Sequence, residues 1–134
     1  MTFLLDTTTF SALMRRNLRV QAKARALAST DSTIICTITR GEVLFGLSRL
    51  SQGKRRSDLE TDARRIFSQF HCVPVPEAAG DRYAQIKFDA ESKGTPLDEN
   101  DLWIAATAVC MGATLVTTDS DFQRVTGLKI ENWT

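Results

Sequence analysis

Short apolar runs alternate along the chain with longer segments in which apolar residues recur every three or four positions. The short runs predict five strands, the last with the weakest pattern: Thr2–Leu5, Thr33–Ile38, Cys72–Val75, Thr114–Thr117 and Lys129–Glu131. The longer segments predict helices that carry apolar side chains on one face. Strands alternating with helices are typical of an α/β fold, with a central, mostly parallel sheet flanked by helices on both sides.

Helical spacing is found in six segments between and after these strands. They include Phe10–Met14, Val20–Leu27, Val43–Leu50, Leu59–Phe67, the stretch between Glu77 and Lys93, and the stretch that Asp101 opens. The chain shows no internal repeat, no low-complexity tract and no linker longer than a few residues. We therefore expect one domain that spans residues 1–134.

Composition narrows the class of protein. Of the 134 residues, 43% are hydrophobic and 25% are charged, as in an ordinary globular protein. The N-terminus lacks a secretory signal pattern, and no apolar stretch is long enough to span a bilayer, so we expect no membrane partner. The three cysteines are widely separated and never form a C-x-x-C pair. They fit buried thiols in a reducing cytoplasm, which is the expected location.

The net charge of +1 conceals an asymmetry between the two halves of the chain. Residues 1–67 hold 12 Lys and Arg against 6 Asp and Glu, which gives +6, whereas residues 68–134 hold 5 against 10, which gives −5. Basic residues cluster at Arg15–Arg25, at Lys54–Arg56 and at Arg64–Arg65. Each cluster is explained by a solvated helix face, but a basic surface beside an acidic pocket also suits a polyanion such as RNA.

Four acidic residues stand where predicted strands end or helices begin. They are Asp6, Glu42, Asp101 and Asp119. The carboxyl ends of parallel strands meet at one rim of the sheet, so these carboxylates are expected to converge there. Such a cluster repels itself unless a cation neutralises it, and Mg²⁺ or Mn²⁺ prefers oxygen ligands. The pattern predicts a metal site suited to phosphate chemistry.

Each acid also has a structural interpretation. Asp6 precedes an apolar-periodic segment and fits a helix N-cap, while Glu42 alone fits a solvated helix position. Asp101 opens a helix, where negative charge is favourable against the helix dipole. Asp119 and Asp121 fit turn positions. The joint placement of the acids favours the metal site over these separate interpretations.

Other catalytic signatures are absent. His71 is the single histidine, so a ribonuclease mechanism that uses a histidine pair lacks its second member. There is no G-x-x-x-x-G-K-[ST] phosphate loop, no G-x-G-x-x-G fingerprint and no G-x-S-x-G nucleophile motif. A phosphatase with Asp6 as nucleophile would need a second Asp two residues later, where Thr8 stands.

The chain resembles the PIN-domain nucleases, and specifically the VapC-type toxins of bacterial toxin–antitoxin pairs. Five short segments carry the resemblance in the right order and spacing: Phe3–Thr7, Ile38–Gly46, Asn100–Ala106, Leu115–Phe122 and Gly127–Trp133. The resemblance spans essentially the whole chain. It implies a PIN-like three-layer fold and a metal-dependent endoribonuclease.

The resemblance also implies roles for particular residues. Asp6 and Asp101 correspond to the principal metal ligands, with Asp119 completing the shell, and Glu42 to the residue that orients or deprotonates the attacking water. Asp121 could fill the last position instead, although Asp119 lies closer to the strand end. Family members often carry Asn two places after the first Asp, whereas this chain has Thr8.

The resemblance further implies products and partners. Cleavage of RNA would leave 5′-phosphate and 3′-hydroxyl ends. The expected partners are a second copy of the chain in a homodimer and a small antitoxin that blocks the pocket, with DNA bound only through the antitoxin. A non-catalytic interaction module is the main alternative, but binding alone does not require all four pocket acids.

Overall fold

A five-stranded sheet organises the chain, with the strands in the order β3-β2-β1-β4-β5. The computed structural model describes all residues, 1–134. Its strands are β1 (Thr2–Leu5), β2 (Ser32–Cys36), β3 (His71–Val73), β4 (Thr114–Val116) and β5 (Ile130–Glu131). Every neighbouring pair runs parallel, which confirms the predicted parallel sheet.

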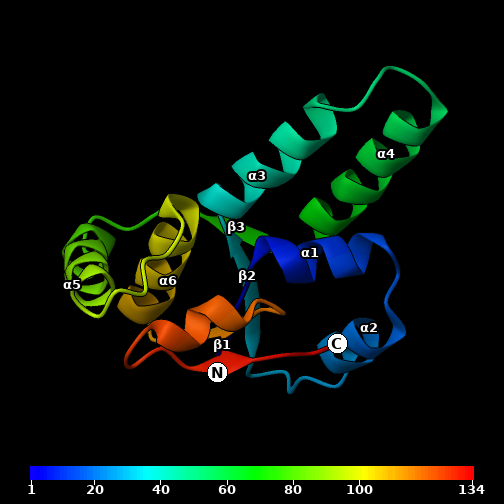
Figure 1. The fold of residues 1–134 in the computed structure, drawn as a ribbon. Coiled ribbons are helices and arrows are strands. Elements are labelled where there is room, and N and C mark those ends of the chain that lie inside the picture. The colour runs from blue at the N-terminus through cyan, green and yellow to red at the C-terminus, as the bar shows by residue number, and fades with distance from the viewer.

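Helices cover both faces of this sheet (Figure 1). They are α1 (Thr7–Met14), α2 (Leu18–Arg25), α3 (Thr37–Ser48), α4 (Lys54–Gln69), α5 (Ala79–Ser92) and α6 (Glu99–Met111), followed by the short 3-10 helix η1 (Ser120–Arg124). None of them combines the length and the apolar character that crossing a membrane would need. The three-layer α/β architecture predicted from the sequence is therefore confirmed.

The central strand divides its side chains between two cores. Phe3 and Leu5 of β1 point to one face, where they pack with residues of α1, α2, α3 and α4. Leu4 points to the other face and packs with α6 and η1. Because successive side chains of a strand alternate in direction, an apolar run such as Phe3–Leu5 serves both layers.

Four of the five strands differ from the prediction at one boundary or both, and two of them end two residues earlier than predicted. The expected strand Thr33–Ile38 ends at Cys36, and Thr37 and Ile38 form the first turn of α3 although β-branched residues favour strands. Ile38 packs into the core beneath α6, which outweighs this preference. The expected strand Cys72–Val75 is instead His71–Val73, because Pro74 has no N–H to continue the ladder.

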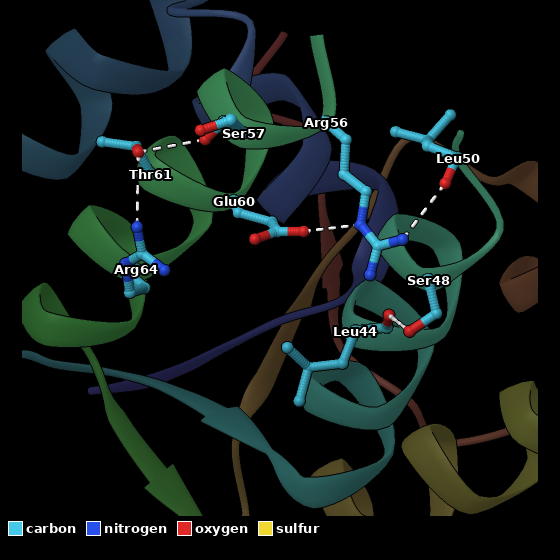
Figure 2. Close-up of polar contacts among 8 residues, drawn as sticks. All are labelled: Leu44, Ser48, Leu50, Arg56, Ser57, Glu60, Thr61 and Arg64. Atoms are coloured by element: carbon cyan, nitrogen blue, oxygen red, sulfur yellow. Dashed lines mark hydrogen bonds and ion pairs between the residues drawn. The ribbon is translucent and has the colours of Figure 1, made fainter. Parts of the chain in front are cut away.

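Helices α3 and α4 form a pair that extends beyond the sheet (Figure 1). Val43 and Leu47 of α3 and Ala63 and Ile66 of α4 are buried in the same core. At the far end of the pair, Arg56 donates to Glu60 at 2.6 Å and to the Leu50 carbonyl at 3.2 Å (Figure 2). Arg56 therefore binds the loop that follows α3 and fixes it against α4.

The C-terminal segment is tied to the first strand through Trp133, which is 3% exposed. Its ring lies 5.4 Å from that of Phe3, and its Nε1 donates to Glu131 at 2.8 Å. We expect Trp133→Ala to lower the free energy of unfolding by about 3–5 kcal/mol, because it opens a cavity in the core. Urea denaturation measures this loss. Trp133→Phe should lose less, and equal losses in the two variants would contradict the packing role.

Candidate active site

The site lies where three adjacent strands end. β1 pairs with β2 on one side and with β4 on the other, so their carboxyl ends share one edge of the sheet. The chain runs from β1 outward to β2 and β3, and later returns to β4 on the opposite side. The boundary between β1 and β4 is thus a topological switch point, where α/β proteins commonly bind ligands.

Asp6 occupies this switch point and is 3% exposed. It caps the N-terminus of α1, as its structural interpretation predicted, because its Oδ1 accepts from the Thr9 N–H at 3.0 Å. The same oxygen accepts from the Thr8 hydroxyl at 2.7 Å, and Oδ2 accepts from the Thr117 hydroxyl. Burial raises the pKa of Asp6, and these hydrogen bonds offset the rise only in part. Capping and membership of the acidic cluster are therefore compatible roles for one carboxylate.

Two threonines connect the end of β1 to the end of β4. The Thr8 hydroxyl, besides donating to Asp6, accepts from the Thr118 N–H at 3.0 Å. The Thr117 hydroxyl, besides donating to Asp6, accepts from the Asp119 N–H at 2.9 Å. Thr8 thus links the first acid to the end of β4, since its hydroxyl binds both Asp6 and the Thr118 N–H.

Glu42 lies in the second turn of α3 and faces the same rim. Its Oε1 accepts from the Thr7 hydroxyl at 2.5 Å, and its Oε2 lies 3.4 Å from the Asn100 amide nitrogen, which donates to it. The carboxylate is therefore held from both sides, by the start of α1 and by the start of α6. Because α3 begins at Thr37, six residues before the predicted helical segment Val43–Leu50, Glu42 sits about one and a half turns into the helix.

Asp101 lies in the first turn of α6, whose N-cap is Asp98. Glu99 in the same turn points away from the cluster, where it accepts from the hydroxyl of Tyr83 and pairs with Lys87 at 3.3 Å. Tyr83 in turn stacks on Trp103 with ring centroids 4.0 Å apart. These contacts fix the start of α6 against α5 and leave Asp101 facing the rim.

Electrostatic coupling shows that the predicted acids share one region. Partial burial and, in decreasing order, the negative charges of Asp119, Asp98, Glu42 and Asp6 together raise the pKa of Asp101 from 3.8 to about 6. None of these five carboxylates forms an ion pair with a Lys or Arg side chain. The structure thus brings together the four predicted acids and adds Asp98 to them.

Asp119 and Asp121 differ in their surroundings. Asp119 follows β4, caps η1 by accepting from the Asp121 N–H at 2.9 Å, and is the charge that acts most strongly on Asp101. Asp121 instead forms an ion pair with Arg124 at 3.1 Å and is not among the main charges that act on Asp101. Of the two candidates, Asp119 is the one that lies in the cluster.

The donor set suits a hard divalent cation, because it consists of carboxylate oxygens with unbalanced negative charge. No three of the His, Cys, Asp and Glu side chains stand close enough to form a ready coordination shell. The cluster nevertheless suits a hard divalent cation in donor type and in charge. Its carboxylates must draw together to coordinate one, which their mutual repulsion opposes until the cation is present.

The sequence analysis missed the uncharged residues that hold the acids in place: Thr7, Thr117 and Asn100. Each is adjacent to an acid or to its turn, but threonine and asparagine beside a strand end are common in any loop. His71 begins the edge strand β3, is exposed and contributes nothing to the cluster.

The raised pKa of Asp101 predicts how stability depends on pH without metal. Between pH 3.8 and about 6 the folded protein holds a proton that the unfolded chain releases, so stability should fall as pH rises through this window. Asp101→Asn removes the titrating group and should flatten this fall. Thermal denaturation in chelator, at several pH values, compares the two proteins. Parallel pH profiles would show that Asp101 is not perturbed by its neighbours.

Comparisons with known proteins identify the family of the chain. The PIN domain family profile matches residues 3–128. VapC ribonuclease Y4jK of Sinorhizobium fredii is 31% identical over 96% of this chain and 94% of its own length. Ribonuclease VapC1 of Haemophilus influenzae (strain R2866) is 27% identical over 100% of this chain and 99% of its own.

A solved structure gives the same result for the fold. VapBC2 from Rickettsia felis, bound to a DNA fragment from its promoter, superimposes with a TM-score of 0.92 over 100% of both chains, at 24% identity. At that identity the likeness concerns the fold alone, whereas the family profile and the relatives cover nearly the full sequence. The chain therefore belongs to the PIN-domain family and, within it, to the VapC ribonucleases.

Proposed function

We propose that the protein is a divalent-metal-dependent endoribonuclease and the toxin of a toxin–antitoxin pair. One observation carries the proposal: Asp6, Glu42, Asp101 and Asp119 meet at the switch point of a parallel sheet, with their negative charge unbalanced. A purely structural role would not require four carboxylates to be placed where each raises the energy of another. Cation-assisted phosphodiester hydrolysis uses such an arrangement.

The ligands of the cation would be Asp6 and Asp101, with Asp119 completing the shell directly or through water. Mg²⁺ fits these oxygens, and Mn²⁺ is an alternative with the same preference. When bound, the cation supplies positive charge that favours ionisation of water and offsets the charge that develops on phosphate oxygens. The threonine hydrogen bonds to Asp6 fix the orientation of its carboxylate before any cation arrives.

Glu42 would orient or deprotonate the attacking water. Its two oxygens are already oriented by Thr7 and Asn100, so a water on the rim side meets a carboxylate of fixed direction. In-line attack on the phosphorus would break the bond to the 3′ oxygen. The products would carry 5′-phosphate and 3′-hydroxyl ends.

RNA is the proposed substrate, consistent with the ribonuclease names of the relatives. The basic half of the chain offers several phosphate-binding candidates, but they differ in position. Arg15 and Arg16 follow α1 at the end opposite Asp6, about 12 Å along the helix, and Arg16 pairs with Asp62 at 3.4 Å. Arg19 lies farther on, in the first turn of α2. This cluster is therefore better placed for the periphery of a substrate, or for a protein partner, than for the scissile phosphate.

The proposed partners are a small cognate antitoxin and a second copy of the chain. Likeness over the full length to the toxin chain fold of a VapBC complex supports an antitoxin that covers the acidic rim. DNA would be bound by the antitoxin and reach this chain only through the complex. The homodimer rests on the family resemblance.

The metal ligands give the first functional prediction. Asp6→Asn and Asp101→Asn should each lower RNA cleavage by roughly 100-fold or more, since each exchanges an anionic ligand for a neutral one of nearly the same shape. Cleavage of total RNA with Mg²⁺ or Mn²⁺ measures the loss. Asp58→Asn, an exposed acid paired with Lys54 on α4, is the matched control and should retain activity.

Two results would overturn the metal-nuclease assignment. One is cleavage at the wild-type rate in either ligand variant, provided that the protein preparation is free of other nucleases. The other is undiminished cleavage by the wild-type protein in excess chelator. If the protein is instead a non-catalytic interaction module, it should cleave no RNA under any condition, which distinguishes this alternative from the two results above.

A second functional prediction ranks the two late acids. Asp119→Asn should lower cleavage more than Asp121→Asn at saturating metal, because Asp119 acts on Asp101 whereas Asp121 is occupied by Arg124. Loss of the exposed Asp121–Arg124 pair should change stability by at most about 1 kcal/mol. The reverse ranking in steady-state cleavage assays would assign the last pocket position to Asp121.

A further inference from the structure

A hollow adjoins the acidic rim along one side of α3. It is open to solvent, has a volume of ≈ 580 Å³, and is lined by Thr7, Glu42, Phe45, Gly46, Arg49 and Asn100 among others. Glu42, Phe45, Gly46 and Arg49 follow one another at helical spacing and so share one face of α3. Glu42 of the proposed active site therefore lines one end of the hollow, and Arg49, two helical turns away, lines the other end.

Phe45 stands in the middle of this hollow and is 65% exposed. Its neighbours Val43 and Leu47, on the sheet side of α3, are both 7% exposed and belong to the core. A single exposed aromatic ring is common on protein surfaces and means little alone. Here the ring lies between the Glu42 carboxylate of the proposed active site and the Arg49 guanidinium. A nucleotide strand bound along this face of α3 would need these groups in this order.

Arg49 is the cation, and it has no acidic partner. Its guanidinium lies 5.7 Å from the centroid of the Phe45 ring and is exposed. Nearby Arg56, by contrast, is held by Glu60 and by the Leu50 carbonyl on the α4 side of the pair (Figure 2). Arg49 is therefore free to bind a phosphate group, about 10 Å along the helix axis from Glu42.

The glycine in this face keeps the hollow open. A Cβ on Gly46 would meet no atom within 4 Å, so close packing does not demand a glycine there. Glycine inside a helix is less favourable than alanine. The absence of a side chain at Gly46 leaves room beside Phe45 for a flat ligand.

We propose that this face of α3 is a subsite for single-stranded RNA, in which Phe45 stacks on an unpaired base and Arg49 binds a neighbouring phosphate. The proposal rests on the ribonuclease function proposed above and adds a structural preference to it. In a duplex the faces of the bases are already stacked on one another, so Phe45 has no free base to meet. The enzyme should therefore select unpaired segments, such as loops, next to the scissile phosphate.

A binding assay tests the subsite without cleavage. The probe is a short fluorescent single-stranded RNA of mixed sequence, titrated into the Asp101→Asn protein with and without Phe45→Ala. Loss of one stacked base should weaken binding roughly 5- to 150-fold, which corresponds to ~1–3 kcal/mol. Phe45→Trp should restore binding. Phe88→Ala removes a ring that is 76% exposed on α5, and it is the matched control that should bind normally.

Two further variants test the rest of the subsite. Arg49→Gln should reduce the slope of log affinity against log salt by about 0.7, as expected for one phosphate contact to a single strand. Arg55→Gln, an exposed arginine of α4, should leave the slope unchanged. Gly46→Leu should fill the hollow and weaken binding even if it stabilises the helix. The same RNA annealed to its complement should bind equally well to the Phe45→Ala and parent proteins.

The outcomes separate the subsite from the proposed function. If the wild-type protein cleaves RNA with Mn²⁺ and Phe45→Ala raises KM while kcat stays within about 2-fold, both are supported. If cleavage occurs and Phe45→Ala leaves KM and binding unchanged, the subsite is wrong and the nuclease stands. If Phe45→Ala binds RNA normally but sediments as a smaller species, Phe45 is a contact between copies, which also overturns the subsite. Absence of cleavage by the wild-type protein rejects the nuclease itself.

Discussion

The rim of the sheet depends on the burial of one carboxylate, that of Asp6, between the ends of β1 and β4. Burying a charge is unfavourable, and each hydrogen bond to a charged group returns about 1.5–3 kcal/mol. Two threonine hydroxyls and one backbone N–H donate to Asp6, yet its pKa is still raised. These hydrogen bonds hold the Asp6 side chain in place without compensating its charge in full, so a cation could still bind it.

The topology of the sheet brings three further acids to the same edge as Asp6. Asp119 follows the strand next to Asp6, and α3 and α6 carry Glu42 and Asp101 to the same edge. The resulting repulsion acts on Asp101, whose pKa of about 6 reflects partial burial and four neighbouring negative charges. A fold with antiparallel strands would place successive strand ends on opposite edges and could not gather these residues in this way.

Much of this arrangement could be predicted from the sequence. Parallel strands follow from the alternation of apolar runs and helical segments, and acids at the ends of β1 and β4 then have to meet. The start of α3 could not be predicted, since Thr37 and Ile38 have the local preference of a strand and are turned into a helix by packing. The sequence favours Asp119 over Asp121 only by its distance from the strand end, and the structure adds the ion pair of Asp121 with Arg124 and the effect of Asp119 on Asp101. Thr7 and Thr117 were missed because their roles depend on distant partners, Glu42 at 35 positions and Asp6 at 111 positions along the chain.

The pairing of α3 with α4 extends the site beyond the carboxylates. Because the buried face of α3 is occupied by Val43 and Leu47, the face that bears Glu42 also presents Phe45 and Arg49 to solvent. The central claim, however, is that the rim binds a divalent cation. Anomalous diffraction from crystals grown with Mn²⁺ tests it most directly. The account predicts a manganese peak between the carboxylates of Asp6 and Asp101, with Asp119 at its edge. Manganese bound elsewhere, with these carboxylates unliganded at saturating Mn²⁺, would contradict it.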